Sequence, residues 1–260
     1  MLSLEQIESF YPEYPRAFKK NLLREYLQHK ILEVVFNSRF GKNLAFLGGT
    51  ALRIIFSHDR FSEDLDFDNR GLNQGDFEKL TELIATNLFR SGYSVELKNV
   101  MGKVFRSYVK IADVLYENKI SRHKNEKLLI QLDMEPQGFD YRPASRIINK
   151  FDLFLRVNYV PPEILLAQKI ACLFLRPRPL GRDFYDVVFL LGRTTPNWKY
   201  LRLKLDIQGG EDLKRKILIR CGDLNLRDLA RDIEPFLIDP AGGNKVSRFL
   251  EYIQGIDFNQ

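Results

Sequence analysis

The feature that most constrains the fold is a short apolar run that meets two glycines and is followed by alternating carboxylates. NLAFL (43–47) predicts a strand that stops at Gly48 and Gly49, and TALRIIFS (50–57) predicts a helix. DLDFD (64–68) alternates strictly, so it predicts a second strand with all three aspartates on one face. Like charges on one face repel one another, and we therefore expect a positive group to sit among them.

The rest of the chain changes character part of the way along. A helix is expected over 21–37, and Asp76 is expected to cap a helix that ends at Gly92. Three β-rich segments should be antiparallel neighbours in one sheet: SVELKNV, KVFRSYVKIADVLY and KLLIQLDMEP. After a connector of mixed type (146–162), nearly every segment predicts helix.

Composition adds only broad limits. The chain has 260 residues, 45% of them hydrophobic, and a formal net charge of +6 with 40 Lys and Arg against 34 Asp and Glu. This basic balance hints at an anionic partner such as RNA, DNA or a nucleotide. The two cysteines form no CxxC pair, the three histidines have no zinc spacing, and the opening residues lack signal-peptide character. No apolar run is long enough to span a bilayer, so we expect a cytoplasmic protein without a membrane partner.

The glycine pair has a possible chemical use. Glycines between a strand and a helix let the backbone approach a bulky anion, and a helix N-terminus adds free N–H donors. The hydroxyl of Thr50 could serve the same phosphate, so Gly48, Gly49 and Thr50 are candidate nucleotide-binding residues. The alternative is a turn with no ligand.

Paired carboxylates beside that turn strengthen the phosphate interpretation. Asp64 and Asp66 lie two apart on a strand, about 6–7 Å along the chain, so both can reach one or two hard cations. Mg²⁺ uses few protein carboxylates and completes its shell with water and substrate phosphate. Gln131, Asp133 and Glu135 likewise stand at alternate positions, on one face of LLIQLDME. Glu135 is near the strand end, so we expect its side chain to be in solvent. The alternative for DLDFD is a solvated edge strand.

These motifs resemble a known family. LGG at 47–49, DLDF at 64–67 and the later Asp133 are similar to the signature of the DNA polymerase β-like nucleotidyltransferase superfamily. The fuller run GGTALR…RFSEDLDF resembles the AbiEii/AbiGii group, toxin components of type IV toxin–antitoxin systems, which also includes the MenT toxins. That group carries a later lysine, an Arg-Asp pair and a further aspartate, which are matched here by Lys169, Arg182, Asp183 and Asp186. The middle strand departs from the group's Lys-hydrophobic-Asp form, because Gln131 precedes Asp133.

The resemblance implies an α+β fold. A polymerase β-like nucleotidyltransferase domain with a mixed sheet flanked by helices would span 1–157, and a C-terminal helical bundle would span 158–260. The active site would lie in the cleft between them.

The resemblance also implies the reaction. A nucleoside monophosphate would pass from an NTP to an acceptor, as in a toxin that modifies tRNA or another RNA and has an antitoxin encoded nearby. Asp64 and Asp66 would bind Mg²⁺, with Mn²⁺ as an alternative ion, and Asp133 would complete the metal site or deprotonate the acceptor. Lys169 would be catalytic and neutralise phosphate charge, and Arg182 and Asp183 would help to bind the nucleotide.

Three alternatives stay open at the level of sequence. Lys169 could be a lysine at the rim of the core, and Asp183 or Asp186 could serve only the start of a helix. The acceptor could be a small molecule, as in antibiotic-modifying nucleotidyltransferases, since the shared motif does not exclude it. The chain could also be a non-catalytic RNA- or protein-binding module, although all three expected aspartates are present.

Overall fold

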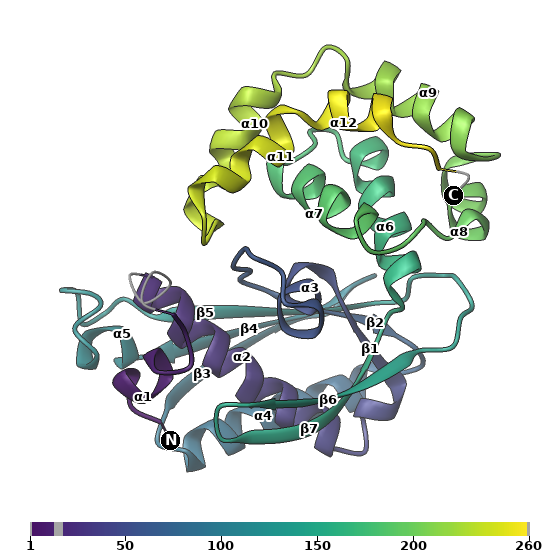
Figure 1. Cartoon of the computed structure of the whole chain (residues 1–260). Helices are drawn as coiled ribbons and strands as arrows, with labels where there is room; N and C mark the ends of the chain where they lie inside the picture. The colour runs from purple at the N-terminus through teal and green to yellow at the C-terminus, as the bar shows by residue number, and fades with distance from the viewer. Residues whose placement is uncertain (1, 13–17, 259–260) are drawn as a thin grey trace. The chain divides into compact units, whose positions relative to one another are not determined.

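The computed structural model describes residues 2–12 and 18–258, which form two compact units (Figure 1). The first unit runs to Ser57 and resumes from Phe61 to Val160. The second unit begins at Pro161 and also contains the short segment His58–Arg60. The sequence placed a division near residue 158, and the chain passes from one unit to the other after Val160.

The first unit is built on a seven-stranded mixed sheet with the order β3-β4-β5-β2-β1-β7-β6. Its strands are β1 (Leu44–Leu47), β2 (Leu65–Asn69), β3 (Ser94–Val100), β4 (Phe105–Ala112), β5 (Leu128–Glu135), β6 (Ala144–Lys150) and β7 (Leu153–Tyr159). The pairs β2–β5 and β1–β7 are parallel, and the other neighbours are antiparallel. The predicted antiparallel neighbours β3, β4 and β5 are therefore confirmed.

Two helices of the first unit, α2 (Lys19–Asn37) and α4 (Gln74–Arg90), cover one face of this sheet. The first unit also contains α1 (Leu4–Glu8), η2 (Gly41–Asn43), α3 (Gly48–Phe56) and α5 (Val114–Glu117). The helices α2 and α4 pack against each other and against the sheet (Figure 1). Apolar residues at alternate strand positions supply the buried face, and burying each large side chain contributes about 1.5–3 kcal/mol.

That alternation decides which residues face away from the helices. In β2, Leu65 and Phe67 are fully buried, and in β5 Leu132 and Met134 are fully buried. Their neighbours Asp66, Gln131 and Asp133 are only half-buried, because they project from the opposite face. The sheet thus separates an apolar core from a polar face that carries the predicted metal ligands.

The second unit is helical. Its elements are α6 (Pro162–Leu175), α7 (Gly181–Leu191), α8 (Trp198–Leu205), α9 (Gly210–Cys221), α10 (Leu226–Ile233), η3 (Glu234–Phe236), η4 (Pro240–Gly243), α11 (Asn244–Ser247) and α12 (Phe249–Gly255). The helix α7 begins against α10, where a Cβ added at Gly181 would lie 1.9 Å from the carbonyl oxygen of Leu229. This close approach explains why α7 starts with glycine.

Three sequence predictions need correction. The N-cap of α4 is Asn73, whose side chain accepts from the backbone N–H of Asp76, so the predicted cap at Asp76 was wrong by one turn. The mixed connector over 146–162 contains most of the hairpin β6–β7. Nearly every segment after residue 162 predicts helix, but α10 ends at Ile233, because Pro235 cannot continue its hydrogen bonding.

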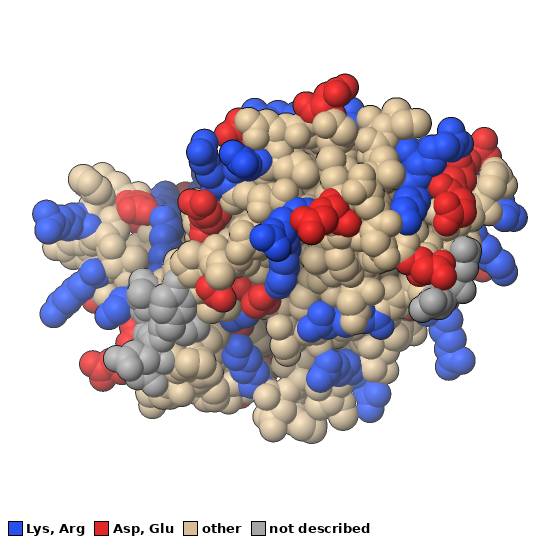
Figure 2. Space-filling model, turned by 45° about the horizontal axis from the view of Figure 1, so that its top comes forward, with Lys and Arg blue, Asp and Glu red and all other residues tan. Residues whose placement is uncertain are grey.

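The surface shows no single dominant charge on the side drawn in Figure 2, where basic and acidic side chains are interspersed. The net charge of +6 therefore does not form one large basic field on that face. Within the described part of the chain, no helix is long and apolar enough to cross a bilayer.

Candidate active site

The glycine pair and the second aspartate of the DLD motif lie against each other in the first unit. Gly48 begins α3 with φ +81°, a left-handed conformation that favours glycine. A Cβ added at Gly48 would lie 2.2 Å from Oδ2 of Asp66, so a side chain there would displace the carboxylate. The N-terminal turn of α3 thus meets a carboxylate face, which brings an anion-binding backbone beside candidate metal ligands.

Thr50 links the same helix to the strand that carries the aspartates. Its side chain is fully buried, and its hydroxyl donates a hydrogen bond to the backbone carbonyl of Asp64. The hydroxyl therefore fixes the start of β2 against α3. Its predicted contact with phosphate stays a prediction, and the backbone N–H groups of Gly48 and Gly49 remain the more direct candidates.

Asp66, Asp133 and Arg106 form a row across three neighbouring strands. Asp66 of β2 is in register with Asp133 of β5, and Asp133 is in register with Arg106 of β4. The guanidinium donates from Nε to Oδ1 of Asp133 at 2.7 Å and from Nη2 to Oδ2 at 2.6 Å. Gln131 also donates to Oδ2 of Asp133 at 3.1 Å. These hydrogen bonds to Asp133 raise the pKa of Arg106 above its ordinary value.

The donor set fits a hard divalent cation held by few protein ligands. Asp64 and Asp66 supply carboxylate oxygens, which Mg²⁺ and Mn²⁺ prefer. Both oxygens of Asp133 accept from Arg106, so ligation by Asp133 requires this pair to open. Among the described residues, no group of three or more His, Cys, Asp or Glu side chains is gathered for a metal ion. Mg²⁺ can be held by two carboxylates when water and phosphate complete its shell, so an ion at Asp64 and Asp66 stays a prediction.

The third aspartate of DLDFD has a different position. Asp68 is buried and accepts from the backbone N–H of Gln137 at 2.9 Å and from the hydroxyl of Tyr141 at 2.6 Å. It therefore holds the loop after β5. Glu135 is half-buried and lies 3.9 Å from the exposed Lys103, in agreement with a solvated strand end.

The second unit gathers the charged residues of the later motif. Asp186 of α7 is fully buried and accepts two hydrogen bonds of 2.7 Å from Arg60, one from Nε and one from Nη2. Lys169 of α6 lies 2.8 Å from Oδ2 of Asp186 and 4.0 Å from Oδ1 of Asp183. The imidazole of His58 lies 3.1 Å from Oδ1 of Asp186.

The electrostatics of this buried cluster are compensated. Burial alone would raise the pKa of Asp186, but Arg60 and Lys169 bring it well below its ordinary value. Burial opposes the charge on Lys169 in the same way, and the two aspartates raise its pKa nonetheless. His58 stacks on Phe189 at 3.8 Å and on Tyr185 at 5.1 Å between ring centroids. The cluster thus ties segment 58–60 to α6 and α7.

Asp183 and Arg182 are adjacent in the sequence but differ sharply in burial. Asp183 is fully buried and lies 3.2 Å from Nε of Arg176, yet neither carboxylate oxygen makes a hydrogen bond of good geometry among the described residues. Arg182 is exposed and borders a separate hollow of about 290 Å³. The structure therefore gathers Lys169 and Asp183 in one cluster and leaves Arg182 outside it.

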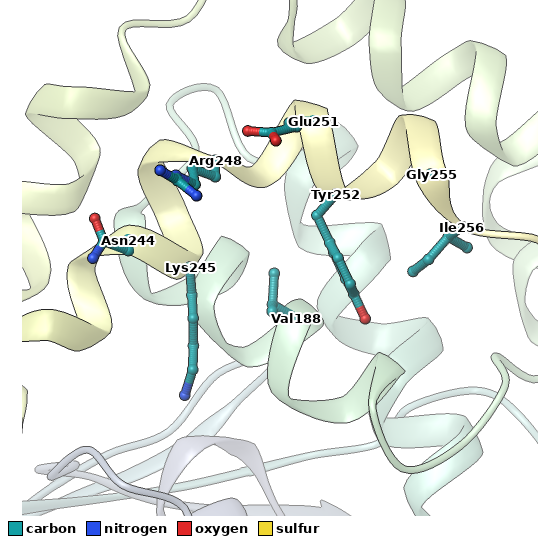
Figure 3. A pocket seen from close by; sticks show the side chains of 8 residues that line it. All are labelled: Val188, Asn244, Lys245, Arg248, Glu251, Tyr252, Gly255 and Ile256. Carbon is teal, nitrogen blue, oxygen red and sulfur yellow. The ribbon is translucent and has the colours of Figure 1, made fainter.

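A pocket in the second unit contains none of the predicted site residues. It has a volume of about 530 Å³ and lies between α11, α12 and Val188 of α7 (Figure 3). The Tyr252 ring and Ile256 give it apolar walls, and the exposed Arg248 lies on its rim. Lys245 points away toward Asp59, with Nζ 3.0 Å from its carboxylate.

Sequence reasoning missed Arg106, Arg60 and His58. Arg106 occupies an alternate position on a predicted strand, which indicates its face but not its partner 27 residues away. Arg60 is the first residue of RFSEDLDF and His58 lies just before that run, but their partner Asp186 is more than 120 residues away. Only the folded chain reveals these pairs.

Comparisons with known proteins identify a family and structures of similar fold. A family model described as the nucleotidyl transferase AbiEii toxin of type IV toxin–antitoxin systems matches residues 30–250. No curated protein matches the chain.

Two solved structures from Helicobacter pylori share the fold. JHP933 is 17% identical with a TM-score of 0.51, over 90% of this chain and 91% of JHP933. A protein described as a candidate nucleotidyltransferase is 17% identical with a TM-score of 0.53, over 90% of this chain and 94% of its own. At this identity the likeness is one of fold. Since the family model spans most of the sequence, the chain belongs to the AbiEii nucleotidyl transferase toxin family of type IV toxin–antitoxin systems.

Proposed function

We propose that the chain transfers a nucleoside monophosphate from an NTP to a hydroxyl of tRNA or another RNA. The bond between the α- and β-phosphates breaks, pyrophosphate leaves, and a divalent metal ion assists the reaction. The observation that carries the proposal is the contact between Gly48 and the carboxylate of Asp66, with Asp133 in register one strand away. This contact sets phosphate-binding backbone beside hard-cation ligands. Family membership supports a nucleotidyl transferase. That the acceptor is RNA, the donor an NTP and the metal ion Mg²⁺ is part of our proposal.

The residues have distinct proposed roles. Asp64 and Asp66 would hold Mg²⁺ or Mn²⁺, which would supply charge stabilisation for the triphosphate. The N–H groups of Gly48 and Gly49 would bind phosphate oxygens. Asp133 would orient or deprotonate the acceptor hydroxyl or complete the metal site once released from Arg106. Lys169, Arg182 and Asp183 stay proposed nucleotide-binding residues, and the proposed catalytic and helical domains span 1–157 and 158–260.

A labelling experiment tests the reaction. The purified chain is incubated with total RNA, Mg²⁺ and each labelled NTP in turn, and we expect the RNA to become labelled or longer. Asp66→Asn should lower the rate by about 10²–10³-fold or more, because charge stabilisation of the transferring phosphoryl group is lost. Asp140→Asn is the matched control, since Asp140 is exposed and lies outside the strands β2 and β5 that carry the candidate ligands. Equal labelling by wild type and Asp66→Asn would contradict the two-aspartate site.

Expression in cells tests the toxin assignment. The proposed partner of the chain is an antitoxin encoded nearby, so expression of the chain without that antitoxin should slow growth. Asp66→Ala should relieve the effect without unfolding the protein. If wild type labels a small hydroxyl compound and no RNA, the antibiotic-type reaction replaces the RNA reaction. If Asp66→Ala stays as harmful as wild type, binding rather than catalysis causes the harm.

A further inference from the structure

The polar face of the sheet continues beyond the candidate active site onto β4 and β3. Next to the row that contains Asp66, Asp133 and Arg106, a second row runs through Gln131 of β5, Tyr108 of β4 and Lys98 of β3. Adjacent strands are about 4.8 Å apart, so the two rows extend the face by roughly 10 Å from β5 to β3. The strands are consecutive neighbours in the sheet (Figure 1).

The second row has one aromatic ring and one cation at its outer end. Tyr108 is half-buried and Lys98 is exposed. The next row along the strands carries Leu129, which is 40% exposed, then Lys110 and then Glu96. In the part of the chain that the structure describes, neither Lys98 nor Lys110 forms an ion pair or a side-chain hydrogen bond. These lysines are available to an anion.

The acidic residues nearest to these lysines have cationic partners. Glu96 lies in register with Lys110 and forms an ion pair with Lys127, and Asp133 accepts two hydrogen bonds from Arg106. The three cations Lys98, Lys110 and Lys127 thus lie near the single carboxylate of Glu96, which leaves two positive charges in excess. A strand of phosphates would therefore meet an attractive surface beside Tyr108, one row away from the carboxylates.

The backbone under this surface is held firmly. Ser107, Val109 and Ile130 alternate with the surface residues and are completely buried against the helices. Tyr108 therefore projects from a packed sheet rather than from a loop. A flat sheet with an aromatic ring and flanking cations suits unstacked bases, whereas duplex RNA offers mainly its backbone and minor groove.

We propose that the face formed by Lys98, Tyr108, Lys110 and Leu129 binds the single-stranded end of the acceptor RNA, with a base stacked on Tyr108 and phosphates at the two lysines. The inference rests on the proposed transfer to RNA and adds the form of RNA that is bound. It also explains how an RNA end could be presented to the aspartates in the neighbouring row.

A binding experiment without NTP or metal tests the surface apart from the reaction. Fluorescence anisotropy of the full chain is measured with a labelled 12-nucleotide single-stranded RNA and with a duplex of the same sequence. Tyr108→Ala should weaken single-strand binding by about 5- to 150-fold, and Tyr108→Phe should restore it, because stacking needs the ring and not the hydroxyl.

A charge-matched pair of double variants completes the test. Lys98→Gln with Lys110→Gln should lower the slope of log affinity against log salt by about 1.4, as expected for two lost phosphate contacts on a single strand. Lys42→Gln with Lys79→Gln removes the same charge at exposed positions of η2 and α4 and should change the slope little. Melting temperatures verify that all variants fold.

The outcomes separate this surface from the proposed reaction. Single-strand binding that is unchanged in Tyr108→Ala, or a salt slope that falls equally in both double variants, overturns the surface even if RNA is labelled. A duplex bound as tightly as the single strand overturns it as well. Weakened binding in Tyr108→Ala supports the surface, and failure of the proposed reaction would be seen separately as absence of Asp66-dependent labelling.

Discussion

The two units carry aspartates from the same set of motifs in opposite physical states. In the first unit, Asp66 and Asp133 are half-buried on the polar face of a sheet. In the second unit, Asp183 and Asp186 are completely buried, and Asp186 is surrounded by Arg60, Lys169 and His58. A carboxylate on an exposed sheet face can be reached by a ligand, whereas Asp186, with both oxygens engaged by cations in the interior, holds the second unit together.

The largest expected difference between the two states is the loss in free energy of unfolding caused by Asp186→Asn. The change removes the carboxylate that pairs directly with both Arg60 and Lys169 in the interior, so it should lower the free energy of unfolding by about 3–5 kcal/mol. Asp66→Asn removes charge from a half-buried face and should cost less than about 1 kcal/mol. Urea unfolding followed by circular dichroism measures both, and equal losses in the two variants would break the comparison.

The features that the sequence predicts are those set by residues close together along the chain. Strict alternation in 64–68 and 128–135 predicted two strands and the faces that carry Asp66 and Asp133, because that pattern has a period of two residues. The hairpin β6–β7 escaped prediction since β6 lies at the sheet edge and β7 exposes Phe154, which blurs the alternation.

The state of each aspartate could not be read in the same way. Periodicity gives the face on which a residue lies, but the pairing of Asp133 with Arg106 depends on a strand 27 residues away. The burial of Asp186 depends on Arg60, which is 126 residues away. Such contacts follow from the whole fold, so a motif predicts the residue and leaves its physical state open.

The first unit also contains a buried carboxylate that is paired with cations, so this state is not confined to the second unit. In the first unit, Glu25 is buried and accepts from Arg53 at 2.9 Å and Lys150 at 2.7 Å. Burial opposes its charge, but Arg53 and Lys150 lower the pKa of Glu25 to about 2. Burial also lowers the pKa of His29, whose Nδ1 lies 2.7 Å from the carbonyl oxygen of Glu25, to about 4.

The sign of the resulting pH dependence is clear. Neutral His29 stabilises the fold fully above pH 6.5, and this stability is lost as pH falls toward 4, since the unfolded chain binds the proton first. The loss should amount to about 3 kcal/mol. Ionised Glu25 adds a further loss between about pH 4.5 and 2. Urea midpoints from pH 7.5 to 4.5 should fall in wild type and fall less in His29→Gln, and parallel curves would contradict this assignment.

Lys169 gives an intermediate test, because it has both a structural partner and a proposed role in catalysis. Lys169→Met keeps the aliphatic stem but removes the charge 2.8 Å from Asp186, while Arg60 still pairs with that carboxylate. The free energy of unfolding should fall by about 2 kcal/mol. Single-turnover kinetics then measure the use of NTP by folded protein.

The two readings of Lys169 differ in how activity follows stability. If Lys169 only holds Asp186, transfer by the folded fraction should stay near wild type. A large loss of kcat/KM for NTP, with the melting temperature unchanged, would show that Lys169 acts on the nucleotide. The contrast between a structural second unit and a reactive first unit would then fail for Lys169. Lys199→Met, on α8, is a control for the loss of one lysine.

The smallest expected effect concerns Asp68, which lies on the same strand as Asp66 but is buried. Tyr141→Phe removes the hydroxyl that donates to Oδ2 of Asp68 at 2.6 Å and leaves the backbone N–H of Gln137 on the other oxygen. The ring remains beside Arg70, whose guanidinium carbon lies 4.6 Å from its centroid. The change should therefore lower the free energy of unfolding by about 1 kcal/mol and leave nucleotide transfer within about twofold of wild type. Thermal melting and the labelling assay measure the two quantities on the same sample. Transfer abolished by Tyr141→Phe in a protein of unchanged melting temperature would move Asp68 from the buried, structural class to the active face, and it would show that burial alone does not separate the two kinds of aspartate.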